Sequence, residues 1–153
     1  MRPRCLDLTP ELRIKRLSDH ARIPAYQTAG AAGMDLHAAI EHPIVVDRGD
    51  IVPIPLGFAM AIPEGYEAQI RPRSGLASRH GITLPNAPGT IDCDYRGEVV
   101  VPLVNLGQDV FTVEPGMRIA QMVVAPVSRV DVVESDELDS TERGAGGFGS
   151  TGR

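Results

Sequence analysis

Long apolar runs are missing from this chain of 153 residues, and none approaches the length needed to span a membrane. Positive charge is not in excess either. The formal net charge is −5, which argues against a broad nucleic-acid-binding face. Cysteine is scarce, and Cys5 and Cys93 stand far apart without a CxxC pair. The N-terminal residues show no apolar segment of a secretory signal peptide. We therefore expect a reduced, cytoplasmic protein without membrane or nucleic-acid partners.

Sustained helical periodicity is also absent, whereas turn-forming residues are frequent. Thirteen prolines and sixteen glycines separate short β-rich runs. The runs are ELRIKRL, IVV, IVPIPLGFAMAI, YEAQIRP, EVVVPLVNL, DVFTV, RIAQMVVAPV and VDVVE. This pattern predicts one all-β domain: a barrel, a sandwich or a jelly roll. Pro102 interrupts one run and should lie at an edge or a bulge, because proline donates no ladder hydrogen bond.

One helix is expected, over residues 74–81, with Ser74 as its N-cap and Gly81 just after its last turn. Arg71, Arg73 and Arg79 surround this segment, and helix starts offer free N–H groups to anions. The pattern therefore suits a phosphate site. A capped surface helix with solvated arginines accounts for the same residues equally well.

Two further segments each combine strand-like sequence with a polar residue. In AGAAGMDLHA, residues 29–38, glycines lead into Asp35, and a turn before a strand with a solvated aspartate explains this. In PGMRIAQMVV, residues 115–124, strand alternation places Ile119 and Gln121 on the same face. A glutamine there is unusual for a core position. The simplest explanation is a buried glutamine satisfied by backbone groups.

The segment NAPGTIDCDYRGEV, residues 86–99, predicts a turn followed by a β-hairpin. On a strand, Asp92 and Asp94 would share one face and Cys93 would take the other. Such paired carboxylates serve as metal ligands or as a general base. Alternatively, Asp94 pairs with Arg96 or caps the turn.

After Val133 the composition becomes acidic and then glycine-rich, ending in RGAGGFGSTGR. Three glycines there match G-x-G-x-x-G, but no strand precedes them and only four residues follow Gly149. A dinucleotide-binding unit is therefore excluded. We expect a core over residues 1–138 and a flexible arm over 139–153.

Taken in order, AGAAGMDL, RPRSGLA, GTIDCDYRGEV, GMRIAQMVV and RGAGGFGSTG resemble the five motifs of the trimeric dUTPases. The resemblance extends from about Ile14 to the C-terminus. It implies a jelly-roll-like, distorted β-barrel or sandwich with one short helix and a flexible C-terminal arm, assembled as a homotrimer with active sites at subunit interfaces. It also implies Mg²⁺-assisted hydrolysis of dUTP to dUMP and pyrophosphate. That reaction keeps uracil out of DNA and supplies dUMP for thymidylate synthesis.

The resemblance also implies roles for individual residues. Asp92 would be the general base that activates the attacking water, and Gln121 would contact that water and the α-phosphate. Asp35 would hold the metal through coordinated water. The expected phosphate contacts are Arg73, Ser74 and Gly75.

Selectivity would come from the segment around residues 86–100. Tyr95 would lie against the deoxyribose, where a 2′-hydroxyl would clash. Asn86 and backbone groups between Thr90 and Val100, including Ile91, would bind the uracil edge, and Gly89 is a further expected substrate contact. In the arm, Arg143 would clamp the γ-phosphate and Phe148 would stack on uracil, and the remaining contacts would be Gly149, Ser150 and Thr151.

Two alternatives stay open from the sequence. The first is a dCTP deaminase, which shares the fold, but such enzymes carry a catalytic glutamate where this chain has Pro102. The second is a non-catalytic β-barrel that senses nucleotides or binds a partner protein through its tail. That protein would not need Asp92, Gln121 and Arg143 together.

Overall fold

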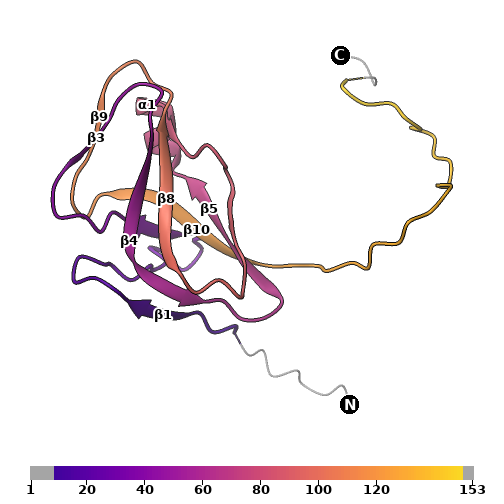
Figure 1. Ribbon diagram of the computed structural model, residues 1–153, viewed down its shortest axis with the longest axis horizontal. Helices are drawn as coiled ribbons and strands as arrows, with labels where there is room; N and C mark the ends of the chain where they lie inside the picture. Colours follow the sequence, from indigo (N-terminus) through magenta and orange to yellow (C-terminus); the bar gives the residue numbers. More distant parts are fainter. Residues whose placement is uncertain (1–8, 150–153) are drawn as a thin grey trace.

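The computed structural model describes residues 9–149, shown in Figure 1. The regular secondary structure of the described residues consists of β-strands and one short helix. The strands are β1 (Arg13–Arg16), β2 (Met34–His37), β3 (Ile44–Val46), β4 (Ile51–Ala61), β5 (Tyr66–Pro72), β6 (Ile82–Thr83), β7 (Gly89–Ile91), β8 (Glu98–Asn105), β9 (Phe111–Val113) and β10 (Arg118–Pro126), and the helix is α1 (Ser74–His80).

Two four-stranded antiparallel sheets carry the fold. Their strand orders are β1-β4-β8-β6 and β2-β10-β5-β7, and β3 pairs with β9 in a small third sheet. Buried side chains from both large sheets form one apolar cluster, which includes Phe58, Leu103, Leu36 and Met122. The all-β prediction is confirmed. In the described residues the strands do not close into a barrel, so the architecture is a jelly-roll-like sandwich.

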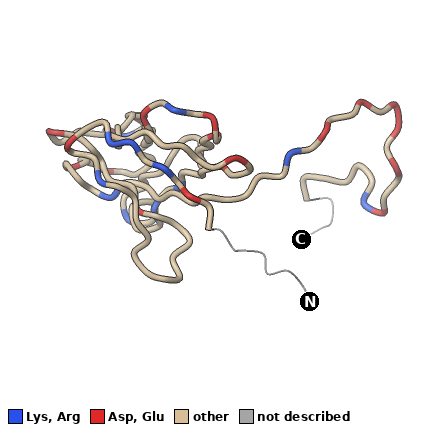
Figure 2. The backbone as a smooth tube through the Cα atoms, turned by 90° about the horizontal axis from the view of Figure 1, so that it is seen from below, with Lys and Arg blue, Asp and Glu red and all other residues tan. Residues whose placement is uncertain are grey.

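The run VDVVE, residues 130–134, is not a strand, and that prediction was wrong. Beyond β10 the described chain contains no further strand and leaves the body of the protein, as Figure 1 shows. Val132 is 92% exposed, and Figure 2 shows acidic residues spaced along the segment. A β-branched run has strand propensity, but a strand also needs a neighbouring edge, which this chain does not supply here.

Helix α1 forms where the sequence predicts it. Gly81 ends the helix in the left-handed conformation, with φ of 68°, and its N–H donates to the carbonyl of Ala77. The N-cap assignment was wrong: Arg73 holds that position with extended backbone angles, and no side chain caps the helix. Ser74 is therefore the first helical residue, one position inside the expected boundary.

Pro102 lies in β8 directly opposite Pro53 of β4. Two facing residues of an antiparallel pair either hydrogen-bond to each other through both backbone N–H and C=O groups, or direct those groups away from each other. Proline has no N–H, so Pro53 and Pro102 must form a pair of the second kind. The backbone nitrogen of Pro102 therefore points away from β4. On that side β6 pairs only with Val104 and Asn105. Pro102 is thus at a local sheet edge, as predicted.

The predicted hairpin over residues 90–101 is not a paired ladder. Strand β7 pairs with β5 in one sheet, whereas β8 pairs with β4 and β6 in the other. The residues between them turn, with the Tyr95 N–H donating to the carbonyl of Asp92 at 3.2 Å. Asp92 and Asp94 therefore lie in a turn and not on a strand. Both are exposed, while Cys93 packs against the core.

The prediction that Ile119 and Gln121 share a face was also wrong. The register of β10 against β2 shifts between Arg118 and Ala120, which marks a bulge. The bulge places Ile119 and Ala120 both in the core and leaves Gln121 half-buried on the other face. Gln121 is consequently available at the outer surface of the sheet.

Candidate active site

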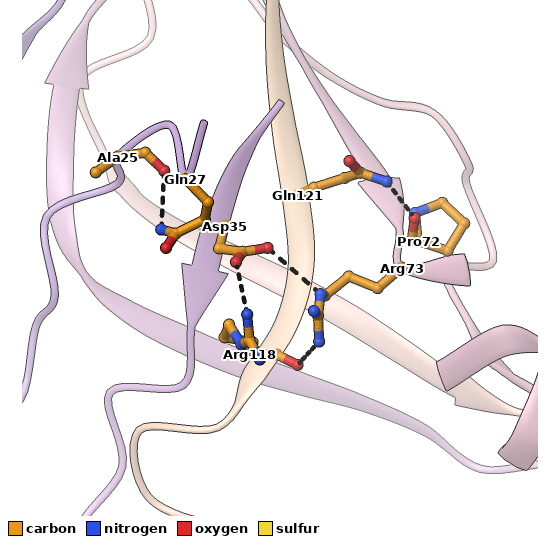
Figure 3. Close-up of polar contacts among 7 residues, drawn as sticks. All are labelled: Ala25, Gln27, Asp35, Pro72, Arg73, Arg118 and Gln121. Atoms are coloured by element: carbon orange, nitrogen blue, oxygen red, sulfur yellow. Dashed lines mark hydrogen bonds and ion pairs between the residues drawn. The ribbon is translucent and has the colours of Figure 1, made fainter. Parts of the chain in front are cut away.

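Four polar side chains meet on the outer face of the β2-β10-β5 layer. We call Asp35, Arg73, Arg118 and Gln121 the Asp35 cluster, shown in Figure 3. Asp35 on β2 faces Gln121 on β10 in the ladder. Arg73 follows the end of β5, which pairs with the other side of β10. The cluster therefore unites residues from three of the segments that the sequence singled out.

Two guanidinium groups balance the carboxylate of Asp35. Nε of Arg73 lies 3.4 Å from Oδ1, and Nη1 of Arg118 lies 3.2 Å from Oδ2. Nη1 of Arg73 also donates to the backbone carbonyl of Arg118 at 3.3 Å. One negative charge faces two positive charges, so these three groups carry net positive charge and attract anions.

Gln121 is held in one orientation. Its Nε2 donates to the carbonyl of Pro72 at 3.0 Å, which is the backbone satisfaction that the sequence suggested. A Cβ placed on Gly33 would lie 2.9 Å from Oε1 of Gln121, so Gly33 leaves room for this side chain. Within the described residues Oε1 accepts no hydrogen bond. It is thus free to orient a water molecule.

A second polar site lies between β7 and β8, where the two segments fail to pair. It is a hollow of about 260 Å³, which we call the β7–β8 hollow. Asp92 and Tyr95 lie on its wall, and the Tyr95 hydroxyl donates to the carbonyl of Glu98 at 3.0 Å. The other lining residues are Thr90, Ile91, Glu98, Val99 and Val100.

The remaining expected contacts fall beside these two sites. Ser74 and Gly75 open α1 directly after Arg73, so they adjoin the Asp35 cluster. Asn86 lies near the start of β7, with its Nδ2 3.3 Å from the position of a Cβ on Gly89.

The structure does not bring Asp35 and Asp92 together in one chain. Asp35, Gln121 and Arg71 face one another across β2, β10 and β5, whereas Ile91 pairs three residues further along β5. Three strand spacings of about 4.8 Å and three residues of about 3.3 Å separate Asp35 from Ile91 by about 17 Å. Asp92 follows Ile91. Asp92, the expected general base, is therefore well separated from the Asp35 cluster of the same chain.

The arm residues do not join either site. The Nε of Arg143 donates to the carbonyl of Gly146 at 2.8 Å, and Phe148 is fully exposed with φ of 49°. Gly149 has φ of 84° and lies in open space. Figure 1 shows this segment extended away from the body of the protein. Ser150 and Thr151 lie outside the described residues.

Two residues near the cluster were not expected from the sequence. Arg118 stood inside the segment GMRIAQMVV, but its reach to Asp35 depends on the pairing of β10 with β2. Nδ1 of His37 is buried and has no partner among the described residues. Burial lowers the pKa of His37 below 6.5, and the nearby positive charge of Arg22 lowers it further.

A family model described as dUTPase matches residues 19–152. The chain belongs to the dUTPase family. Among the described residues, no helix is long and apolar enough to cross a membrane. The enzyme class expected from the sequence, a dUTP diphosphatase, is confirmed by relatives named deoxyuridine 5'-triphosphate nucleotidohydrolase.

Two curated relatives carry the name deoxyuridine 5'-triphosphate nucleotidohydrolase. The protein of Sinorhizobium medicae is 59% identical over 150 residues, covering 95% of this chain and 94% of its own. The protein of Rickettsia bellii is 55% identical over 143 residues, covering 93% and 95%. A solved dUTPase of Staphylococcus bacteriophage 80alpha with dUPNHPP has a TM-score of 0.86 at 28% identity, covering 94% and 99%.

Proposed function

We propose that this protein hydrolyses dUTP to dUMP and pyrophosphate in the cytoplasm. The observation that carries the proposal is the β7–β8 hollow, where an exposed carboxylate, Asp92, lies on the wall together with Tyr95 and Ile91. A pocket of this kind suits a base and its sugar, with the phosphates directed outward past Asp92. The relatives named above act on, or hold an analogue of, this nucleotide.

Asp92 acts as the general base. It takes a proton from a water molecule whose oxygen attacks the α-phosphorus, and the bond from that phosphorus to the bridging oxygen of pyrophosphate breaks. Gln121 orients the water through its free Oε1. The phosphates are bound by Arg73 and by the residues that open α1, Ser74 and Gly75. The net positive charge of the Asp35 cluster stabilises the charge that develops on the phosphates.

The active site is composed of residues from different copies of the chain in a homotrimer. The separation of about 17 Å between Asp35 and the end of β7, estimated from strand geometry, supports this proposal. A β7–β8 hollow of one copy then meets the Asp35 cluster of another. Closed cyclic symmetry repeats such an interface so that each site is complete.

The residues of the cluster fit a hydrated Mg²⁺ that arrives on the triphosphate. Among the described residues no group of three histidine, cysteine, aspartate or glutamate side chains could enclose a metal ion. Asp35 offers one carboxylate, 14% exposed, which suits contact through metal-bound water. When bound, the ion neutralises phosphate charge.

The arm over residues 139–153 closes over a site on a neighbouring copy. The segment from Pro126 to Arg143 spans up to about 55 Å when extended, which is enough to cross a subunit. Arg143 then binds the γ-phosphate and Phe148 stacks on uracil. Gly149, Ser150 and Thr151 complete the closure, because glycine lets the backbone approach phosphate closely.

Base selection comes from the β7–β8 hollow and from the turn that precedes β7. Asn86 and the backbone of β7 present hydrogen-bonding groups to the uracil edge, and a close wall excludes the methyl group of thymine. The contacts that we assign to uracil are Asn86, Gly89, Thr90, Ile91 and Val100.

The test is a pyrophosphate-release assay with Mg²⁺ on dUTP, UTP, dTTP and dCTP. We expect turnover of dUTP only, and a loss of roughly 10²–10⁴-fold in Asp92→Asn, the usual contribution of a positioned general base. Asp94→Asn is the matched control, since Asp94 is exposed in the same turn. Equal loss in both variants would refute the role of Asp92, and ammonia release from dCTP would favour a deaminase.

A further inference from the structure

The hydroxyl group of Tyr95 is already occupied by the protein. It donates a hydrogen bond to the backbone carbonyl of Glu98 at 3.0 Å, at the start of β8. Because this donor is in use, the Tyr95 hydroxyl is not free to donate to a ligand in the β7–β8 hollow, which Tyr95 lines. Any selection against a 2′-hydroxyl at this wall is therefore steric, and its strictness depends on how firmly the ring is held.

Gly97 provides the space in which the ring lies. A Cβ added to Gly97 would stand 2.3 Å from the hydroxyl oxygen of Tyr95 and 2.6 Å from the ring carbon that bears it. These approaches are far below van der Waals contact, so even alanine would force the ring to move. The backbone angle of Gly97 is not in the left-handed region that favours glycine. The requirement for glycine is thus one of space.

Glu98 fixes the other end of the same contact. Its Oε1 accepts a hydrogen bond from the N–H of Gly57 at 3.0 Å. The carbonyl of Gly57 in turn accepts hydrogen bonds from Leu17 and Ser18 at 2.8 and 3.1 Å. Gly57 lies in an irregular stretch of β4, where the register against β8 shifts between Pro55 and Ala59. Glu98 therefore ties the carbonyl that holds Tyr95 to the buried backbone of β4.

We infer that Gly97 and Glu98 are positioning residues that determine selectivity between deoxyribose and ribose by holding the ring of Tyr95 against the sugar. The inference rests on the proposed function, because it requires Tyr95 to face the sugar of bound dUTP. Gly97 is not among the residues that line the β7–β8 hollow, whereas Glu98 is. The effect of Gly97 therefore passes through Tyr95, and this makes the inference separable from a general structural role at Gly97.

The expected effects differ among variants. Gly97→Ala displaces the ring and lowers the ratio of kcat/KM for dUTP to that for UTP by on the order of tenfold. Glu98→Ala removes the acceptor for the Gly57 N–H and should also lower this ratio. Glu98→Gln keeps an oxygen acceptor at that position, so it restores selectivity close to that of the unchanged protein.

The deciding experiment is a double-mutant cycle on this selectivity ratio. Gly97→Ala is measured alone and in a Tyr95→Ala background. We expect a clear loss alone and a change of less than about twofold in the Tyr95→Ala background, because coupled residues are not additive. A Gly97→Ala effect that persists without the ring, or an unchanged ratio in Gly97→Ala itself, overturns the inference.

Controls separate this outcome from others. Gly30→Ala adds the same methyl group in open space and should leave the ratio unchanged. Tyr95→Phe removes only the hydroxyl and should lower the ratio even where Gly97→Ala fails to fold. Tyr26→Phe removes the hydroxyl of an exposed tyrosine elsewhere and should leave the ratio unchanged. If Tyr95→Phe leaves the ratio unchanged, the hydroxyl contact does not hold the ring and the inference fails. If the wild-type protein releases no pyrophosphate from dUTP, both the proposed function and this inference are refuted.

Discussion

Nη1 of Arg118 lies 3.2 Å from Oδ2 of Asp35, so an ion pair joins β10 to β2 beside Gln121. The Arg118 side chain is 52% exposed, whereas that of Asp35 is only 14% exposed. A pair with one partner in solvent adds little to stability, about 0–1 kcal/mol. The pair therefore matters more for the orientation of the Asp35 carboxylate than for the fold.

Replacing Arg118 by glutamine should lower activity without lowering stability. We expect kcat/KM for dUTP to fall by about tenfold, since a misplaced contact group costs rate steeply. The thermal unfolding midpoint should hardly move. Arg13→Gln removes the same charge from the exposed strand β1 and should leave kcat/KM unchanged. Equal loss of activity in both variants would indicate a general charge effect.

The strand pattern was readable from the sequence because strand propensity and turn residues are local properties. Residues 44–46, 66–72 and the segment ending at Gly81 appear as predicted. Partner choice is not local. The segment around Asp92 has hairpin-like sequence, yet β7 pairs with β5 while β8 pairs with β4 and β6. Each of the two strands buries its apolar side chains as part of a different sheet.

The candidate site shows the same division. Gln121 could be singled out because a polar residue interrupts an apolar strand, Arg73 because it precedes a predicted helix start, and Asp35 because glycines lead into it. Arg118 could not be assigned to Asp35, because an unforeseen bulge at Ile119 sets the register of β10. A bulge adds one residue without a distinctive sequence signal, so the face that each later side chain takes cannot be counted from alternation.

His37 should make the protein less stable in mild acid. Burial, and then the charge of Arg22, lower its pKa below 6.5 in the folded state, while nearby Asp35 opposes this and Arg118 and Arg73 add to it. Below about pH 6.5 the unfolded chain therefore binds more protons at this position than the folded chain does. Stability is unaffected by His37 above that pH and falls as the pH decreases through the folded pKa.

Urea unfolding at pH 7.5, 6.0 and 5.0 measures this effect. The unchanged protein should lose more unfolding free energy between pH 7.5 and 5.0 than His37→Gln does. His42→Gln removes an exposed histidine and should follow the unchanged protein. Parallel pH profiles for all three proteins would contradict the prediction.

Truncation after Asp139 should separate folding from turnover. Among residues 127–149, the hydrogen bond to the body of the protein is that of the Val127 N–H to the carbonyl of Gly65, which the truncation leaves in place. We expect an unchanged thermal midpoint and a loss in kcat/KM for dUTP of about a hundredfold, the size expected when phosphate contacts are lost. A truncated protein with full activity would show that the arm has no part in catalysis.

Mixing two inactive variants tests whether the site is shared between copies. Asp92→Asn keeps an intact Asp35 cluster, and Asp35→Asn keeps an intact β7–β8 hollow. When the two variants are co-expressed in equal amounts, copies assemble at random. Each site then has about a one-half chance of an intact hollow and about a one-half chance of an intact cluster, so about a quarter of the sites are intact. The mixture should therefore regain about a quarter of the activity of the unchanged protein.

The matched control is a mixture of Asp92→Asn with Tyr95→Ala. Both lesions lie in the same hollow, so no pairing of these copies creates an intact site and activity should not exceed that of Tyr95→Ala alone. Recovery in the first mixture but not in the second can arise only if the hollow and the cluster of one site belong to different chains. If neither mixture recovers, each site is built within a single chain, and the separation of Asp35 from Asp92 would have to close by a rearrangement of β7.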